Sequence, residues 1–229
     1  MKHLYSDFVY CKNNFFNDPD SVLKLAESLP YPNHGRIYPG SRTIDLALSS
    51  DPVHQEFVKI LVDKLITEIY TNISQVQISV SFHKYPKYEN QELNNGWVHT
   101  DHEMLAGVVY LNKDTNDFKA GTSLYSSPEN VTMPDIIREE FNLDHTSVNT
   151  DDYLSAQTSH NSQFKETIQV GNLYNRLITY DAKVAHRPNN YAIDQVGNRL
   201  ALLFVISDYR CWPRTYKIED NHQAIPKLF

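Results

Sequence analysis

The chain has 229 residues, 41% of them hydrophobic and 21% charged, which is the balance of a globular protein able to bury a sizeable core. Its formal net charge of −7 argues against a nucleic-acid partner, because such surfaces need excess positive charge. No window approaches the length of a membrane span and the first residues hold no long apolar run, so we expect a cytoplasmic protein without a membrane partner. In that compartment Cys11 and Cys211 are expected to be free thiols.

Two helices are predicted before any long strand. The first lies within residues 14–28, where Asn17 and Asp18 precede Pro19, a capping residue followed by proline in the first turn. The second covers residues 52–70, because apolar residues recur there at spacings of three and four. The predicted apolar face of this second helix consists of Val53, Phe57, Ile60, Leu61, Leu65 and Ile69.

From residue 75 onward the apolar period becomes that of β-strands. Five strands are predicted at VQISVSFHKY, GVVYLN, GTSLYSS, NLYNRLITYD and NRLALLFVIS, each bounded by turn-forming residues. Strands that follow one another without helices between them indicate an antiparallel sandwich or barrel. Residues 126–168 interrupt the pattern with a polar insertion that includes a predicted short helix at PDIIREEF. A loop of this length is usually functional or partly disordered, so two interpretations stay open: a lid or wall over a substrate entrance, and a flexible segment without a role.

The run WVHTDHEMLAGVVYLNKD places a His-x-Asp pair, His99 and Asp101, just before a strongly β-forming stretch. If residues 98–103 are extended, these two side chains point to the same face. His186 is the best candidate for a third metal ligand, because it follows another predicted strand. Two histidines and one carboxylate form the facial triad of non-haem Fe(II) oxygenases. A His-x-Asp pair is also common at ordinary strand ends, so the prediction depends on this setting.

Arginine at the start of the last predicted strand supports a cosubstrate site. On an extended strand the face of Arg199 is otherwise apolar, and it carries Ala201, Leu203 and Val205. Burying an arginine is costly without an anionic partner, and the distal carboxylate of 2-oxoglutarate would supply one in bidentate geometry. Arg176, in YNRLITY, ranks second for the same role.

Five motifs in order resemble the prolyl-hydroxylase-like branch of the Fe(II)/2-oxoglutarate-dependent dioxygenase superfamily, including uncharacterised bacterial and phage relatives. They are KYPKY before the His-x-Asp pair, VVYLNKD after it, then GTSLY, NRLITYDAKVAH and NRLALLFVI, across about residues 78–207. The resemblance implies three iron ligands, namely His99, Asp101 and His186. It implies three cosubstrate contacts, namely Arg199 on the distal carboxylate, Tyr110 and Tyr85. The chain departs from the branch at Gly121-Thr122, where relatives carry two glycines.

The resemblance also implies the fold, which is mainly β with N-terminal helices (α+β) around a double-stranded β-helix, a cupin-like jelly roll. We expect one domain over residues 1–229, with a helical support at 1–74 and a jelly-roll core at 75–210 that contains the insertion at 126–168. The implied activity is that of a dioxygenase that uses Fe(II), 2-oxoglutarate and O₂ to hydroxylate a peptide side chain or small molecule, with release of succinate and CO₂. Two alternatives stay open: a non-catalytic jelly-roll binding or structural module, and a cupin-type metal enzyme that does not use 2-oxoglutarate.

Overall fold

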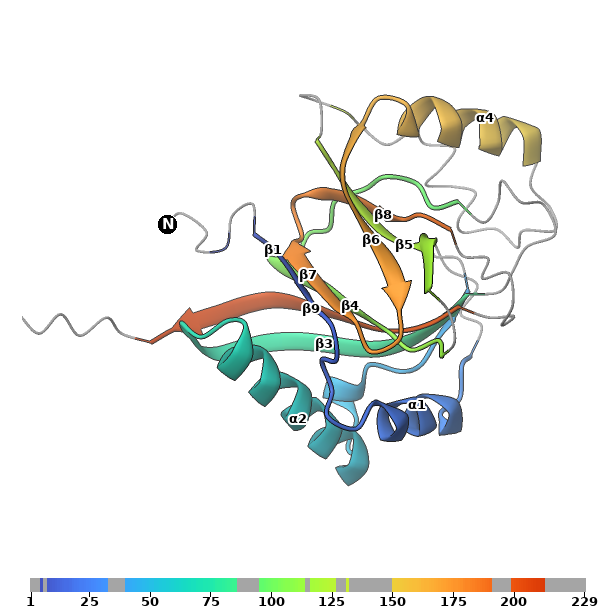
Figure 1. Cartoon of the computed structure of the whole chain (residues 1–229). Helices are drawn as coiled ribbons and strands as arrows, with labels where there is room; N and C mark the ends of the chain where they lie inside the picture. The colour runs from blue at the N-terminus through green and yellow to red at the C-terminus, as the bar shows by residue number, and fades with distance from the viewer. Residues whose placement is uncertain are drawn as a thin grey trace, which may run out of the picture.

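The computed structural model describes residues 5, 8–32, 40–85, 95–113, 116–126, 131, 150–190 and 199–212. Within them, two antiparallel sheets lie one over the other (Figure 1), a six-stranded sheet in the order β1-β7-β4-β9-β3-β2 and a three-stranded sheet in the order β6-β5-β8. The predicted fold class, mainly β with N-terminal helices around a double-stranded β-helix, is confirmed.

The strands of the large sheet are β1 (Val9–Lys12), β2 (Ser41–Arg42), β3 (Ile73–Tyr85), β4 (Leu105–Tyr110), β7 (Leu177–Asp181) and β9 (Arg199–Cys211). The small sheet consists of β5 (Asn116–Ser126), β6 (Lys165–Leu173) and β8 (Ala185–Pro188). The helices are α1 (Pro19–Ser28), the short 3-10 helix η1 (Leu46–Leu48), α2 (Pro52–Glu68) and α4 (Thr150–Asn161).

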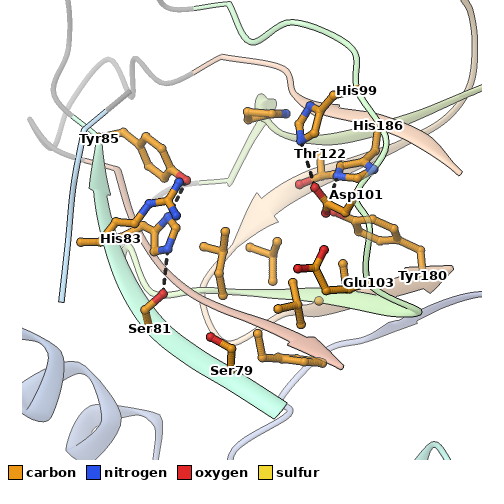
Figure 2. A pocket seen from close by; sticks show the side chains of 18 of the residues that line it. Ser79, Ser81, His83, Tyr85, His99, Asp101, Glu103, Thr122, Tyr180 and His186 are labelled. Carbon is orange, nitrogen blue, oxygen red and sulfur yellow. Dashed lines mark hydrogen bonds and ion pairs between the residues drawn. The ribbon is translucent and has the colours of Figure 1, made fainter. Parts of the chain in front are cut away.

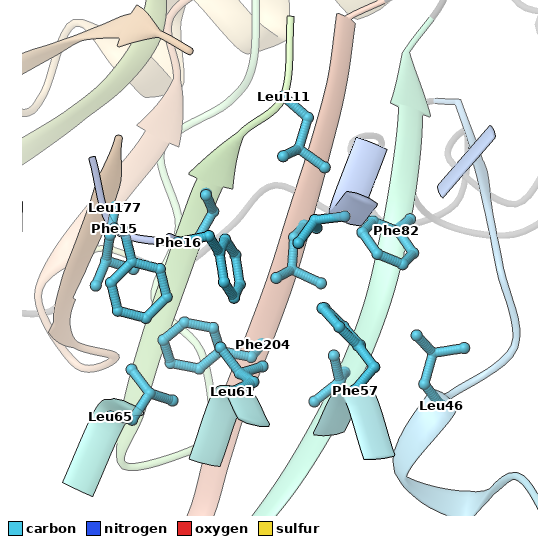
Figure 3. Packing of buried hydrophobic residues seen from close by; sticks show 14 of the residues in the cluster. Phe15, Phe16, Leu46, Phe57, Leu61, Leu65, Phe82, Leu111, Leu177 and Phe204 are labelled. Atoms are coloured by element: carbon cyan, nitrogen blue, oxygen red, sulfur yellow. The ribbon is translucent and has the colours of Figure 1, made fainter. Parts of the chain in front are cut away.

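The main hydrophobic core lies between the large sheet and the helices α1 and α2, on the side away from the small sheet (Figures 1 and 3). Side chains of α2 pack there against side chains of β3 and β9, and the rings of Phe57 and Phe82 stack with centroids 5.6 Å apart. Each such buried side chain contributes about 1.5–3 kcal/mol relative to exposure. The opposite face of the sheet is thereby left for polar residues between the two sheets.

Both predicted helices are present, and α1 begins at the predicted cap. Asp18 accepts a hydrogen bond from the backbone N–H of Ser21 at 3.1 Å, and Pro19 occupies the first turn. Asp51 caps α2 in the same way through the N–H of Val53. The caps place proline where its missing N–H costs nothing.

The predicted apolar face of α2 is wrong at two positions. Phe57, Leu61 and Leu65 are buried, whereas Val53 and Ile60 are 61% and 45% exposed. With about 100° of rotation per residue, the buried stripe follows the i, i+4 row and Ile60 lies on its flank, roughly 100° from the middle of the stripe. Val53 continues the row but lies in the first turn of the helix. Apolar spacing of three and four marks both the stripe and its flank, so it does not separate them.

The predicted strand NLYNRLITYD is in fact two strands joined by a tight turn. The chain leaves β6 after Leu173 and enters β7 at Leu177, and between them Asn175 has a φ of 60°. Asparagine tolerates this left-handed conformation better than most residues. Its carboxamide accepts from the N–H of Phe16 and donates to the C=O of the same residue, both at 2.8 Å. The turn therefore ties the hairpin to the segment before α1.

The predicted insertion at 126–168 contains ordered elements at its C-terminal end. Helix α4 ends at Asn161, and β6 begins at Lys165, so the boundary of the polar insertion was placed too late. Residues 165–169 are all exposed on a strand at the edge of the small sheet, which explains why they lack an alternating apolar pattern. The predicted helix at PDIIREEF lies outside the described residues.

Gly107, in the middle of β4, faces the helix side of the large sheet, and a Cβ atom there would lie 2.2 Å from the ring of Phe204. We expect Gly107→Ala to lower the free energy of unfolding by about 1–3 kcal/mol through overpacking. Urea unfolding measures the change. Combining Gly107→Ala with Phe204→Leu should recover part of the loss, and a double variant less stable than both single variants would contradict this account.

Candidate metal centre and its cavity

The structure brings His99, Asp101 and His186 together, each offering one ligand atom, with these atoms all within 4.8 Å of one another (Figure 2). His186 Nε2 lies 3.3 Å from one carboxylate oxygen of Asp101, and His99 Nε2 lies 3.8 Å from the other. The donor set of two imidazoles and a carboxylate on one side of a small space fits a divalent metal such as Fe(II).

Backbone pairing, rather than a continuous strand, positions the three side chains. The expectation that residues 98–103 are an extended strand is wrong, since His99 forms only an isolated antiparallel bridge with His186. In that bridge His99 N–H donates to His186 O at 2.9 Å, and His186 N–H donates to His99 O at 2.8 Å. Asp101 is held separately, through its N–H on the C=O of Ala182. His186 itself lies within β8 of the small sheet.

Each histidine has its second ring nitrogen on a backbone carbonyl. Nδ1 of His99 lies 3.0 Å from Trp97 O, and Nδ1 of His186 lies 2.9 Å from Val184 O. A carbonyl only accepts, so Nδ1 carries the proton and Nε2 keeps its lone pair toward Asp101. The sequence analysis did not identify these two acceptors.

Burial and neighbouring groups shift the pKa values of His99 and Asp101 toward the forms that a metal needs. Burial, followed by the neighbouring His186, lowers the pKa of His99 to about 4, so its imidazole is neutral at pH 7. Burial alone would raise the pKa of Asp101, but the adjacent His186, with His99 and His102, outweighs burial and lowers that pKa. A neutral imidazole beside an ionised carboxylate is the protonation state of a facial triad.

The triad lies at one end of a cavity of about 300 Å³ between the two sheets. Arg199 lines the same cavity, and as predicted Leu203 and Val205 line it from the same strand. Arg199 is only 2% exposed. Its guanidinium carbon lies 5.3 Å from the ring centre of Tyr85 and 5.6 Å from that of Tyr110. A positive charge at this depth suits an anionic ligand.

The two predicted tyrosines differ in their relation to the cavity. Tyr85 lines it, directly across the strand pair from Arg199. Tyr110 is fully buried and is not among the described residues that line the cavity. Its hydroxyl donates to Thr122 Oγ1 at 2.8 Å. Thr122 is the residue that replaces the second glycine of the related motif, and it lines the cavity itself. The substitution thus supplies an acceptor for the tyrosine.

Arg176, the second candidate for the carboxylate site, lies away from the cavity. It sits in the turn between β6 and β7, where its Nε donates to Asn13 Oδ1 at 2.7 Å and Nη1 donates to Gly171 O at 3.1 Å. Its contacts hold the turn.

Several lining residues were not identified from the sequence. The ring of Tyr180 lies against that of His186, with centroids 4.7 Å apart and the ring planes tilted by 55°. The others with polar side chains are Arg42, Ser79, Ser81, His83, Glu103 and Thr122. Strand alternation in VQISVSFHKY could have found the serines and His83, since they share a face with Tyr85.

Helix α4 holds the segment that leads into His99. Gln157 donates to Asn95 O at 2.9 Å, and His160 Nε2 lies 2.8 Å from Val98 O. Asn161 makes two contacts, accepting from Val98 N–H at 2.8 Å and donating to Gly96 O at 3.1 Å. All four contacts are to backbone atoms. The described part of the insertion therefore supports the metal-ligand segment.

Comparisons with known proteins agree with this architecture. HygX from Streptomyces hygroscopicus, solved with nickel and 2-oxoglutarate bound, is similar over 88% of this chain and 83% of its own, with a TM-score of 0.55 and 11% identity. The non-heme alpha ketoglutarate dependent epimerase SnoN from nogalamycin biosynthesis is similar over 90% and 82%, with a TM-score of 0.54 and 10% identity. A prolyl hydroxylase from Trichoplax adhaerens is similar over 87% and 83%, with a TM-score of 0.50 and 14% identity. No curated protein matches the chain.

At these identities the likeness concerns the fold, which is the double-stranded β-helix of the 2-oxoglutarate-dependent Fe(II) oxygenases. The resemblance drawn from the five motifs is confirmed at that level. The chain belongs to the family of unknown function DUF6445, which matches residues 5–195. In the described part of the chain, no helix is long and apolar enough to cross a membrane.

We expect the purified protein to bind one Mn(II), as a stable substitute for Fe(II), and expect His99→Ala, Asp101→Ala and His186→Ala each to abolish that binding. Isothermal titration calorimetry measures it, and circular dichroism shows whether each variant folds. His102→Ala is the matched control, because this exposed histidine adjoins Asp101 without belonging to the group. Three variants that bind Mn(II) as tightly as the parent would refute the triad.

Asn161→Ala removes two of the hydrogen bonds from α4 to the segment before His99. We expect it to weaken Mn(II) binding about tenfold, as changes behind a metal ligand commonly do. Gln163→Ala is the control, since the side-chain amide of this exposed residue donates to Ser159 O within the helix end, at 3.5 Å, and not to the segment before His99. The same titration compares both with the parent. Equal affinity in all three proteins would mean that α4 does not position His99.

Proposed function

We propose that this protein is a non-haem Fe(II), 2-oxoglutarate-dependent dioxygenase that hydroxylates a peptide side chain or a small molecule. The observation that carries the proposal is the placement of two unlike groups in one cavity. Three side chains that could hold a metal ion line the cavity at one end, and a deeply buried arginine lines the same cavity from β9 of the large sheet. In a metal enzyme that does not use 2-oxoglutarate, this arginine would have no cosubstrate carboxylate to bind.

In this proposal each residue of the chain has a defined part. His99, Asp101 and His186 hold Fe(II) on one face, which leaves positions for the cosubstrate and O₂. Iron and 2-oxoglutarate together would supply the oxidation of a C–H bond, with release of succinate and CO₂. Arg199 holds the distal carboxylate and thereby orients the cosubstrate toward the triad.

Proteins of this fold have been solved with either kind of molecule, a peptide or a small molecule. The Trichoplax adhaerens prolyl hydroxylase was solved in complex with a hypoxia inducible factor peptide fragment, and HygX with hygromycin B. We propose a single domain over residues 1–229, with residues 75–210 as its core. The non-catalytic module and the cupin-type enzyme remain the competing functions, and Fe(II)-dependent succinate release from 2-oxoglutarate separates the proposal from both.

Arg199 provides the sharpest test of the cosubstrate. We expect 2-oxoglutarate to bind the Mn(II)-loaded parent, and Arg199→Ala to cost about 2–5 kcal/mol of that binding, because a buried carboxylate would lose its partner. Arg199→Lys should also bind more weakly, since it keeps the charge but loses the two-pronged geometry. Calorimetric titration of 2-oxoglutarate measures these affinities.

Arg176→Ala is the control for Arg199, because Arg176 was the alternative basic residue and lies in the β6–β7 turn. It should bind 2-oxoglutarate like the parent, and Mn(II) affinity should be unchanged in all variants. Unaltered binding in Arg199→Ala would move the cosubstrate site elsewhere, and a parent that binds no 2-oxoglutarate would end the dioxygenase proposal.

A further inference from the structure

Three polar side chains on the inner face of β3 form a continuous hydrogen-bonded chain that no part of the proposed reaction uses. Ser81 Oγ lies 2.9 Å from His83 Nε2, and His83 Nδ1 lies 3.0 Å from the Tyr85 hydroxyl. All three residues line the cavity, and Figure 2 shows them along one strand, across from the metal-binding group. His83 is only 4% exposed, so this chain replaces water as its partner on both ring nitrogens.

A neutral imidazole has one N–H, so the chain has two possible directions. In one, Ser81 donates to Nε2, Nδ1–H donates to the Tyr85 oxygen, and the Tyr85 proton points to a further acceptor. In the other, Tyr85 donates its proton to Nδ1 and Nε2–H donates to Ser81, so Tyr85 has no proton left for a ligand. Burial, with the charges of Arg42 and Arg199, holds the pKa of His83 well below its usual value, so the doubly protonated ring is excluded.

An anion beside Tyr85 selects between these directions. Tyr85 is the direct strand partner of Arg199, whose guanidinium carbon lies 5.3 Å from its ring centre. A carboxylate held by Arg199 only accepts hydrogen bonds, so it favours the direction in which Tyr85 donates outward.

We propose that Ser81, His83 and Tyr85 form a relay that presents the Tyr85 proton to the distal carboxylate of a bound dicarboxylate, with His83 as the positioning residue that fixes its direction. This inference rests on the proposed function for the identity of the dicarboxylate, 2-oxoglutarate. It assigns Tyr85 as a binding residue and gives His83 and Ser81 a role.

The relay also links the two ends of the cavity wall. When the carboxylate fixes the outward direction, Ser81 uses its proton on His83 and offers only lone pairs to other groups in the cavity. When the site is empty, Ser81 is free to donate. Cosubstrate binding therefore changes the hydrogen bonding that Ser81 offers to a second ligand, which is a coupling between two sites.

The proton position on His83 is directly measurable. Nitrogen-15 NMR of histidine-labelled protein distinguishes a protonated ring nitrogen from an unprotonated one, and His83→Gln identifies the signal by its loss. We expect His83 to carry its proton on Nδ1 in the Zn(II)-loaded protein with 2-oxoglutarate, and in the metal-free protein with glutarate. If His83 had only a structural role, the position of its ring proton would not depend on whether the acid is bound.

Affinities give a second readout. Tyr85→Phe and His83→Phe should each weaken 2-oxoglutarate binding to the Mn(II)-loaded protein about tenfold, the value of one hydrogen bond to a charged group. The double variant should be no weaker than either single variant, because both remove the same interaction. His83→Gln should recover part of the affinity, since its amide can donate to Tyr85 and accept from Ser81. Ser79→Ala, on the same strand face and outside the relay, should bind like the parent.

The relay and the proposed function fail in different ways. If 2-oxoglutarate binds the parent but His83 carries its proton on Nε2 in the complex, or Tyr85→Phe binds like Ser79→Ala, the relay is refuted and the dioxygenase stands. If glutarate places the proton on Nδ1 while 2-oxoglutarate does not bind, the relay stands and the proposed cosubstrate falls. If neither acid places the proton on Nδ1, the relay is refuted.

Discussion

The pair of backbone hydrogen bonds between His99 and His186 is the contact on which the candidate site depends. It joins an irregular segment that precedes β4 to a short strand of the small sheet, so two residues 87 positions apart face each other with fixed geometry. Side-chain rotation alone then brings both Nε2 atoms to Asp101. The precision of the site comes from the main chain, and the ring contacts with Trp97 and Tyr180 limit the remaining freedom.

The two faces of the large sheet differ: one packs against the helices, and the other lines the candidate site. Its outer face carries the main core with α1 and α2, where the buried residues are almost all apolar. Its inner face contains buried groups that a core would normally exclude, among them Arg199 and His83. Placing such groups between sheets costs free energy unless they find partners or a ligand. The apolar packing on the other side of the same strands offsets that cost, so the fold tolerates a polar cavity.

Much of this architecture could be predicted from the sequence, for physical reasons that differ between elements. Period-two alternation found β3, apolar and β-branched runs bounded by turn-forming residues found β4 and β9, a capping aspartate followed by proline found the start of α1, and apolar spacing found α2. The short β8 and the exposed β6 carry no such pattern, because one has four residues and the other presents polar side chains to water. Residue-type reasoning proposed the metal group and Arg199, since few chemistries combine them.

Other parts of the site leave no trace in the residue types. The carbonyls behind His99 and His186 belong to Trp97 and Val184, and a carbonyl is the same in every residue. The bond from Tyr110 to Thr122 joins strands whose register only the folded chain sets. The role of α4 depends on a long-range contact with residues 95–98, and neither sequence segment predicts that contact by itself.

The way α4 grips that segment has a consequence for how the family can diverge. Because Gln157, His160 and Asn161 hold only main-chain atoms, the identity of a held residue such as Asn95 is free to drift, whereas the amides and imidazole that hold it are not. Gly96 and Val98 are exceptions, because a Cβ at Gly96 would lie 2.7 Å from Pro188 O and the Val98 side chain is buried. The sequence requirement of this contact therefore lies mainly in the helix, and a relative without this helix would need other contacts to position the residue equivalent to His99.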